Sequence, residues 1–408
     1  MVLAVRAVHY IDDPYPYYHR LRAADPVHWH AAMELWTVTR HADACAALLH
    51  PALSSRRPEP QLERYDATAR PLARSVYGTL STWMVRLDAP AHTRLRAFAN
   101  RALHARVMTG MRERLRRTAD GLLDALPDIH QLEVISQLAA PLALSGIASL
   151  LGVPAAQQGQ LRQWTDAVGA AAEAGLEPEG LADAQHSLEA ARDCFGGILA
   201  QRRQSPQADL LSGLLRVSAE GDCLDEEEVT GISMLLLLAG HDTVKHMVAN
   251  SIGALLQNPT QLGRLRSTPE LLESAVRECL RYDSPLQGVL RVANADLQIG
   301  AKRISRGQSV VIWLAAANRD PVEFPEPDRF NIARENTRHL AFGHGAHRCL
   351  GAALALPTIG AALEALLARA PRLQLVECGD WQGNFLFRSR ASLLATFRRK
   401  NSGPRRPV

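Results

Sequence analysis

The sequence predicts a mainly helical protein that carries a few small β-sheets. Apolar residues follow helical spacing over long stretches between Arg94 and about residue 200. One apolar segment of about 30 residues, beginning after Asp225, predicts a helix that crosses the interior. Extended segments are short and several are flanked by Gly, Asp or Pro; they lie at 36–39, 297–299, 309–314 and 373–376.

The segment that follows Asp225 predicts the longest helix of the chain. Asp225 and the three glutamates after it place negative charge at a helix start, where the helix dipole favours it. The apolar run ends at Asn258-Pro259, so the helix would be roughly 45 Å long. Asp242 and Lys245 interrupt its middle, and buried charge is costly unless it has a partner or a function.

Composition favours one soluble globular unit over residues 1–408, with 400–408 as a frayed tail. The chain is 47% apolar and 22% charged and shows no linker, so it can bury a large core. The apolar stretch at 234–239 is far shorter than the roughly 20 residues of a membrane span, and the N-terminus lacks a signal peptide. We therefore expect a cytoplasmic protein without a membrane span.

Charge and cysteine usage exclude further classes of protein. The net charge of +4 is small for this length and the arginines are dispersed, which disfavours nucleic-acid binding. The six cysteines are scattered and form no Cys-x-x-Cys pair, which argues against a zinc site or a disulfide framework.

One cysteine lies in a segment of unusual composition, HLAFGHGAHRCLGAALAL. Ten residues hold Phe342, Gly343, Gly345, His347, Cys349 and Gly351. A thiolate that binds a metal needs backbone N–H donors around sulfur and room for a macrocycle, which glycines provide. A helix start after Cys349 would also favour an anion there. A plain Gly-rich turn with a buried cysteine is the ordinary alternative, but six spaced residues make it the weaker one.

This segment resembles the haem-binding loop of the cytochrome P450 family, Phe-Gly-x-Gly-x-His-x-Cys-x-Gly. The resemblance implies a triangular helical body whose long central helix crosses the haem. It implies haem b as cofactor, with Cys349 as the iron ligand and Phe342, Gly343, His347 and Gly351 in contact with the group. A thiolate ligand favours O–O cleavage, so the expected chemistry is activation of O₂.

Haem carries two propionates, and four residues lie where the family places their partners. His92 and Arg96 are four apart on one helical face, Arg291 lies in a strand-like segment, and His347 precedes the cysteine by two residues. Taken singly, each would be read as a surface charge or a satisfied core histidine.

The resemblance also implies a buried charge triad that braces the haem loop. Glu278 and Arg281 are three apart on one helical face, and Arg329 lies in a Pro-Asp-Arg-Phe segment typical of the third partner. Without the resemblance, a solvated ion pair would be the better interpretation of Glu278 and Arg281.

The middle of the long helix resembles the family's oxygen-binding segment. Ala239 and Gly240 would let the helix approach the haem, Thr243 would donate to bound oxygen, and Asp242 would pass protons inward. The alternative is an amphipathic helix whose Asp and Thr face solvent. The chain departs from the familiar pattern at Val244-Lys245, where the lysine is expected to pair with Asp242.

A second departure follows the cysteine. Leu356-Pro357-Thr358 stands where many bacterial relatives carry an arginine and a glutamate, and Pro357 should remove one helical hydrogen bond and kink that helix.

The resemblance places substrate contacts in mostly apolar segments, which indicates a hydrophobic substrate. The candidates are Trp83, Met84, Val289, Leu290 and Phe385.

The sequence has no Gly-rich dinucleotide fingerprint and no room for a flavin domain. Electrons are therefore expected from NAD(P)H through a separate reductase and a ferredoxin or flavodoxin. The docking face would lie near Arg348, with Arg101, Arg112 and Arg114.

The resulting functional hypothesis is an O₂-dependent monooxygenase that hydroxylates or epoxidises a hydrophobic small molecule in secondary metabolism. Oxidative coupling or desaturation by the same haem stays open, because the substrate pose decides it. A non-catalytic haem-thiolate sensor or binding protein is the alternative from another class. A substrate attached to a carrier protein is compatible with the enzymatic hypothesis.

Overall fold

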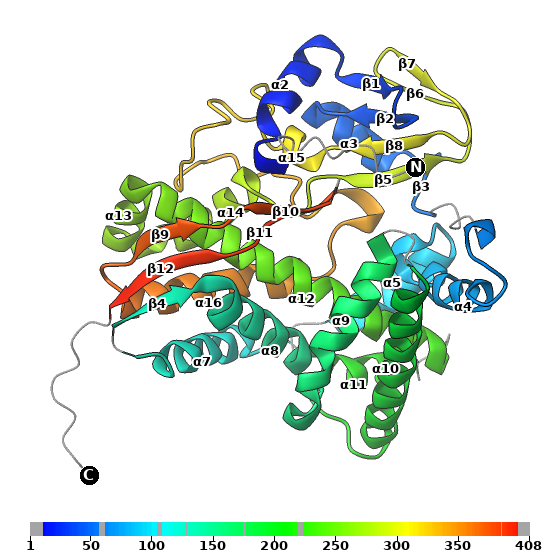
Figure 1. Ribbon diagram of the computed structural model, residues 1–408, viewed down its shortest axis with the longest axis horizontal. Helices are drawn as coiled ribbons and strands as arrows, with labels where there is room; N and C mark the ends of the chain where they lie inside the picture. Colours follow the sequence, from blue (N-terminus) through cyan, green and yellow to red (C-terminus); the bar gives the residue numbers. More distant parts are fainter. Residues whose placement is uncertain are drawn as a thin grey trace.

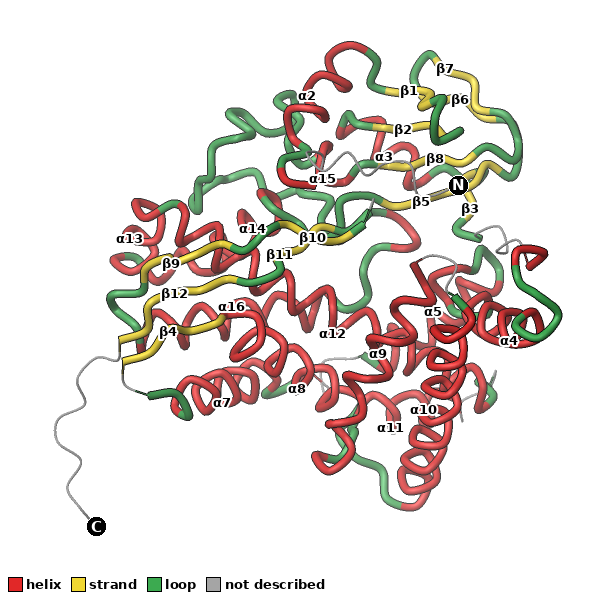
Figure 2. The backbone as a smooth tube through the Cα atoms, viewed as in Figure 1, coloured by secondary structure: helices red, strands yellow, loops and turns green. Residues whose placement is uncertain are grey.

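The computed structural model describes residues 11–56, 62–103, 108–127, 129–173, 177–218, 223–384 and 386–398. It shows a helical body with small sheets along one side and at one end, which confirms the predicted fold class (Figures 1 and 2). The α-helices are α2 (Tyr15–Ala24), α3 (His41–Leu49), α4 (Arg70–Ser81), α5 (Ala91–Ala102), α7 (Met111–Asp124), α8 (Ala140–Leu151), α9 (Gln158–Glu173), α10 (Pro178–Gln204), α11 (Leu210–Ser218), α12 (Glu226–Gln257), α13 (Pro259–Ser267), α14 (Leu272–Tyr282), α15 (Leu314–Ala317) and α16 (Ala352–Arg369).

The strands form four small sheets within the described residues. They are β1 (Val27–His30), β2 (Leu35–Val38), β3 (Leu53–Ser54), β4 (Ile129–Glu133), β5 (Val289–Ala293), β6 (Leu297–Ile299), β7 (Lys302–Ile304), β8 (Ser309–Ile312), β9 (Gln374–Cys378), β10 (Trp381–Gly383), β11 (Arg388–Arg390) and β12 (Leu393–Arg398). The largest sheet has the order β1-β2-β8-β5-β3, and only its β2–β8 pair is parallel. The other sheets are β4-β12-β9, β10-β11 and β6-β7.

All four extended segments expected from the sequence are strands, namely β2, β6, β8 and β9. The stretch from residue 94 to 200 is less uniformly helical than expected, because β4 lies within it. β4 pairs antiparallel with β12, more than 250 residues away, as Leu132 opposite Ala395 illustrates. Its partner is thus remote in sequence, and local periodicity could not reveal the pairing.

The long central helix is α12, and its N-terminus is capped as the charges suggested. The Asp225 carboxylate accepts from the Glu228 backbone N–H, while the Glu228 side chain accepts from the Asp225 N–H. This capping box satisfies two groups that a helix start leaves unpaired. α12 extends over 32 residues and runs through the middle of the molecule (Figure 1).

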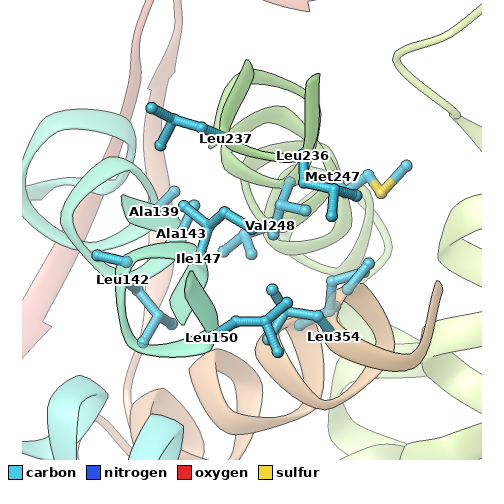
Figure 3. Packing of buried hydrophobic residues seen from close by; sticks show 14 of the residues in the cluster. Ala139, Leu142, Ala143, Ile147, Leu150, Leu236, Leu237, Met247, Val248 and Leu354 are labelled. Atoms are coloured by element: carbon cyan, nitrogen blue, oxygen red, sulfur yellow. The ribbon is translucent and has the colours of Figure 1, made fainter. Parts of the chain in front are cut away.

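The core around α12 is built mainly from aliphatic side chains. Ile147 and Leu150 of α8, Val248 of α12 and Leu354 of α16 belong to one buried cluster, seen from close by in Figure 3. The helix after the cysteine is therefore held directly against the central helix.

Among the described helices, α16 alone is long and apolar enough to cross a membrane by length and composition. However, 56% of it is buried inside the protein, and it lies among α7, α8, α12 and α14. Buried core helices pass the same test, and α16 packs as a core helix.

Candidate functional site

Cys349 lies between a 3₁₀ turn (Gly345–His347) and the start of α16. The Cys349 N–H donates to the Phe342 carbonyl at 2.8 Å and closes the cysteine loop, residues 340–351. Gly343 and Gly345 have φ of +66° and +73°, which favours glycine. At Gly345 a Cβ would also lie 2.9 Å from the Leu48 carbonyl oxygen at the end of α3. The loop shape thus depends on both glycines.

Cys349 is an exposed residue, and its sulfur receives two backbone donors. Desolvation by the surrounding protein raises the pKa of this thiol, whereas the N–H groups of Gly351 and Ala352 and the Arg96 guanidinium act to lower it. These donors at the start of a helix suit a thiolate, the form in which cysteine binds a metal. Gly351 has φ of −78°, so no backbone strain requires glycine there.

Cationic and imidazole side chains from three elements converge beside the loop. His92 and Arg96 project from α5, Arg291 lies on β5, and His347 lies in the loop. The rings of His92 and His347 have centroids 4.0 Å apart. Desolvation, and after it the nearby His92 and Arg291, lower the pKa of His347 to about 3. The carboxylate of Asp88 acts to raise that pKa. The cluster is therefore positive and partly desolvated, as a site for anionic groups should be.

The arrangement fits a haem. A cysteine sulfur with two N–H donors suits the iron, and the cluster of His92, Arg96, Arg291 and His347 suits the propionates. The Arg96 guanidinium also donates to the Arg348 carbonyl at 2.6 Å, which ties α5 to the cysteine loop.

In the middle of α12, Ala239 is exposed although most of the helix around it is buried. The Thr243 hydroxyl, one turn later, donates back to the Ala239 carbonyl. Gly240 faces α8, where a Cβ would lie 2.9 Å from Ile147 Cδ1. The absence of a side chain at Gly240 therefore serves packing between α8 and α12, which the sequence interpretation did not foresee.

The expected pair of Lys245 and Asp242 is present. Lys245 Nζ lies 2.5 Å from Asp242 Oδ1, and His246 Nε2 lies 3.7 Å from the same oxygen. Desolvation acts to raise the pKa of Asp242. The charge of Lys245 and the hydrogen bond from its ammonium act in the opposite direction, and the net effect is a lowered pKa. His246 was not among the residues singled out in the sequence.

The charge triad contains a different third residue from the one expected. Arg281 Nε lies 2.6 Å from Glu278 Oε2, and both side chains are almost fully buried. Arg334, not Arg329, is the third partner, with Nε 3.1 Å from Glu278 Oε2. Arg329 points to solvent, 64% exposed, and pairs with Glu326.

The correction has a physical reason. Glu326 has φ of +48°, and the tight turn around it directs the Arg329 side chain outward while its carbonyl still accepts from Arg334. Phe330 and Ile332 are buried, and Arg334 follows at the same spacing of two. That period-two pattern in the sequence is the signal that could have identified Arg334.

The proposed substrate residues are only partly brought together. Trp83 and Met84 are buried, and Trp83 lies against Gly231 of α12. Val289 and Leu290 are consecutive on β5 and pack with different core clusters, so they face opposite sides of the strand. Val289 shares its side with Arg291. Phe385 lies outside the described residues.

Comparison with known proteins agrees with this geometry. The cytochrome P450 family model matches residues 185–370. The chain is 35% identical to the biotin biosynthesis cytochrome P450 of Bacillus subtilis, covering 94% of this chain and 95% of that protein. It is 36% identical to the cytochrome P450 monooxygenase PikC of Streptomyces venezuelae, covering 97% of this chain and 93% of that protein.

A solved structure extends the likeness to the whole fold. P450BioI in complex with an acyl carrier protein ligated to hexadec-9Z-enoic acid superposes with a TM-score of 0.87 at 34% identity, covering 96% of this chain and all of that one. The chain therefore belongs to the cytochrome P450 family. Its enzyme class is that of a cytochrome P450 monooxygenase, which confirms the class inferred from the cysteine loop.

Proposed function

We propose that this protein is a haem-thiolate monooxygenase that hydroxylates or epoxidises a hydrophobic small molecule in secondary metabolism. The observation that carries the proposal is the exposed residue Cys349, whose sulfur has two backbone donors, set beside the cluster of His92, Arg96, Arg291 and His347. When bound, haem supplies an iron whose thiolate ligand favours activation of O₂.

Each element of the chain has a separate task in this proposal. Cys349 holds the iron, and the cluster of His92, Arg96, Arg291 and His347 binds the propionates. Phe342, Gly343 and Gly351 shape the thiolate side of the site. Ala239 and Gly240 shape the opposite side, with Gly240 keeping α12 close to α8.

Proton supply is assigned to Asp242 and Thr243. The Asp242 side chain is 41% exposed, so its carboxylate can exchange protons with solvent. Thr243 Oγ1 donates to the Ala239 carbonyl, and rotation about χ1 would direct that hydrogen away from the helix. Together these groups provide a short path from solvent toward the oxygen-binding side.

The substrate is proposed to contact Trp83, Met84, Val289, Leu290 and Phe385. Trp83 and Met84 are buried and apolar, and Trp83 lies directly against α12. A carrier-bound substrate is a second form of the proposal, and the complex of P450BioI with an acyl carrier protein favours it.

Electrons are proposed to come from NAD(P)H through a reductase and a ferredoxin or flavodoxin in the cytoplasm. The donor would dock near Arg348, which is exposed on the cysteine loop, and the exposed residues Arg101, Arg112 and Arg114 would join that face. Arg112 is already paired with Glu364 of α16, so Arg348 and Arg101 are the more available charges.

The proposal is tested by turnover with a surrogate ferredoxin and reductase under ¹⁸O₂. Candidate substrates are supplied both as free acids and attached to a carrier protein. Incorporation of one ¹⁸O atom into the product supports monooxygenation. Loss of two hydrogens without oxygen gain would instead assign desaturation or coupling. Haem binding without any oxidised product under either supply would favour the non-catalytic alternative.

A further inference from the structure

We propose that Lys245 and His246 compete for the Asp242 carboxylate, and that His246 positions this carboxylate when Lys245 turns away to solvent. The inference rests on the proposed function, because it concerns the group assigned to proton supply. It adds a residue, His246, and an order of events: the carboxylate becomes available when the lysine releases it, and the histidine then keeps it oriented.

The helix geometry brings Lys245 and His246 close to the same oxygen of Asp242. Lys245 and His246 follow Asp242 by three and four residues, the two spacings that place side chains on the same helical face. Lys245 Nζ lies 2.5 Å from Asp242 Oδ1, and His246 Nε2 lies 3.7 Å from that same oxygen. The imidazole is therefore just outside hydrogen-bond distance while the ammonium occupies the oxygen.

His246 is built into the interior rather than free to move. Its side chain is 6% exposed, and its ring meets Phe387, beside β11, edge to face at 5.5 Å between centroids. Its Nδ1 has no hydrogen-bond partner among the described residues. With a proton on Nε2, the neutral ring would direct an N–H toward the Asp242 carboxylate, whose Oδ1 lies 3.7 Å away.

Lys245 is the less enclosed of the two partners, since its side chain is 18% exposed and that of His246 is 6% exposed. The Lys245 side chain consists of a flexible four-carbon stem ending in a strongly hydrated ammonium. The carboxylate that it holds is 41% exposed, so solvent partly screens the ion pair. Rotation of that stem would release Asp242, whereas packing of its ring against Phe387 keeps His246 in place.

The charged groups that face His246 come from α12 itself. Desolvation, then Lys245, lowers the pKa of His246 to about 4, while Asp242 acts to raise it and His241 to lower it slightly. His241 points instead to α9, where its Nδ1 lies 2.9 Å from Thr165 Oγ1. From the β10–β11 side the described contact is the uncharged ring of Phe387.

The first test is histidine NMR on the haem-loaded protein in its diamagnetic ferrous–CO state. Lys245→Met removes the rival cation, so the pKa of His246 should rise by about one to two units and its Nε2 signal should become that of a hydrogen-bonded N–H. Lys302→Met, which removes the lysine of the Lys302–Asp25 pair, is the matched control and should leave His246 unchanged. An unchanged titration and tautomer of His246 in Lys245→Met would overturn the inference.

The second test measures how O₂ consumption divides between product and hydrogen peroxide. Lys245→Met should lower the peroxide fraction, and adding His246→Phe should raise it again because the carboxylate loses its second partner. Lys245→Met with His246→Asn, which restores an N–H donor, should recover part of the coupling. Equal peroxide fractions in all three would contradict the positioning role.

Failure of this inference is distinguishable from failure of the proposed function. A protein with a haem-thiolate spectrum and an unresponsive His246 contradicts the inference alone. A protein without that spectrum contradicts the proposed function, and the inference falls with it.

Discussion

Arg329 and Arg334 lie five residues apart around the same turn, yet only Arg334 is buried against Glu278. Arg334, and not Arg329, is therefore the third member of the buried charge triad. Arg281 and Arg334 together surround one carboxylate, and the Asn331 N–H also donates to Glu278 at 2.9 Å. A buried carboxylate with this many donors is stable only while they remain in place.

Arg334→Ala should destabilise the protein by about 3 kcal/mol, because it leaves Glu278 short of one buried cation. Arg329→Ala is the matched control and should change the free energy of unfolding by less than about 0.5 kcal/mol, since its side chain is exposed and pairs with Glu326 at the surface. Urea unfolding of both variants measures the two costs. A larger cost for Arg329→Ala than for Arg334→Ala would contradict the revised triad.

Thr243→Ala should increase the share of O₂ that is released as hydrogen peroxide, because it removes the hydroxyl proposed to deliver a proton. The control is Ser233→Ala on the same helix, which loses an equivalent hydrogen bond to the carbonyl four residues earlier. Ser233 is ten residues, or about 15 Å, from Thr243. If both variants release peroxide equally, the effect belongs to the helix and not to the Thr243 hydroxyl.

Elements differed in how well the sequence specified them. The capping box of α12 was predictable because Asp225 and Glu228 act within one turn. Strand β4 was not, because its pairing with β12 depends on contacts that form only in the folded chain. The same distinction applies to the site. Cys349 belongs to a compact motif, whereas His246 acquires its importance from Phe387, which is remote in sequence.

Helix α16 continues through Pro357, at its sixth residue. Proline has no N–H, so the helical hydrogen bond to the Ala353 carbonyl is missing. Pro357→Ala should restore that bond and raise the free energy of unfolding by about 1 to 2 kcal/mol, after allowance for the stiffer unfolded chain that proline gives.

Pro178→Ala provides the control for this change. Pro178 is the first residue of α10, where a missing N–H costs no helical hydrogen bond, so no gain in stability is expected there. Thermal unfolding of the two variants compares them directly. Equal shifts in Tm would show that Pro357 does not weaken α16.

At the scale of the whole molecule, histidines that are buried or half-buried link folding to pH. Desolvation lowers the pKa of His241, His246 and His339 to about 4, from the value of 6.5 that is usual for an exposed histidine. Between those two values the unfolded chain binds protons that the folded chain does not. The stability that these groups contribute is therefore complete above pH 6.5 and is lost progressively as the pH falls to about 4.

Each of these histidines should contribute a slope of up to about 1.4 kcal/mol per pH unit in that window. Urea unfolding between about pH 7.5 and pH 4 measures the slope. His241→Gln should flatten it, while His186→Gln, at an exposed position of α10, should not. A stability that is constant across this range would contradict the burial of these rings.

The central claim is that Cys349 binds a haem iron through its thiolate, and the CO spectrum of the dithionite-reduced protein tests it most directly. The account predicts a Soret band at the long-wavelength position characteristic of CO opposite a thiolate, and loss of that band in Cys349→Ser. Cys279→Ser, at the buried cysteine of α14, should keep it. A folded protein that binds no haem when haem is supplied, or that keeps the band without Cys349, would contradict the account.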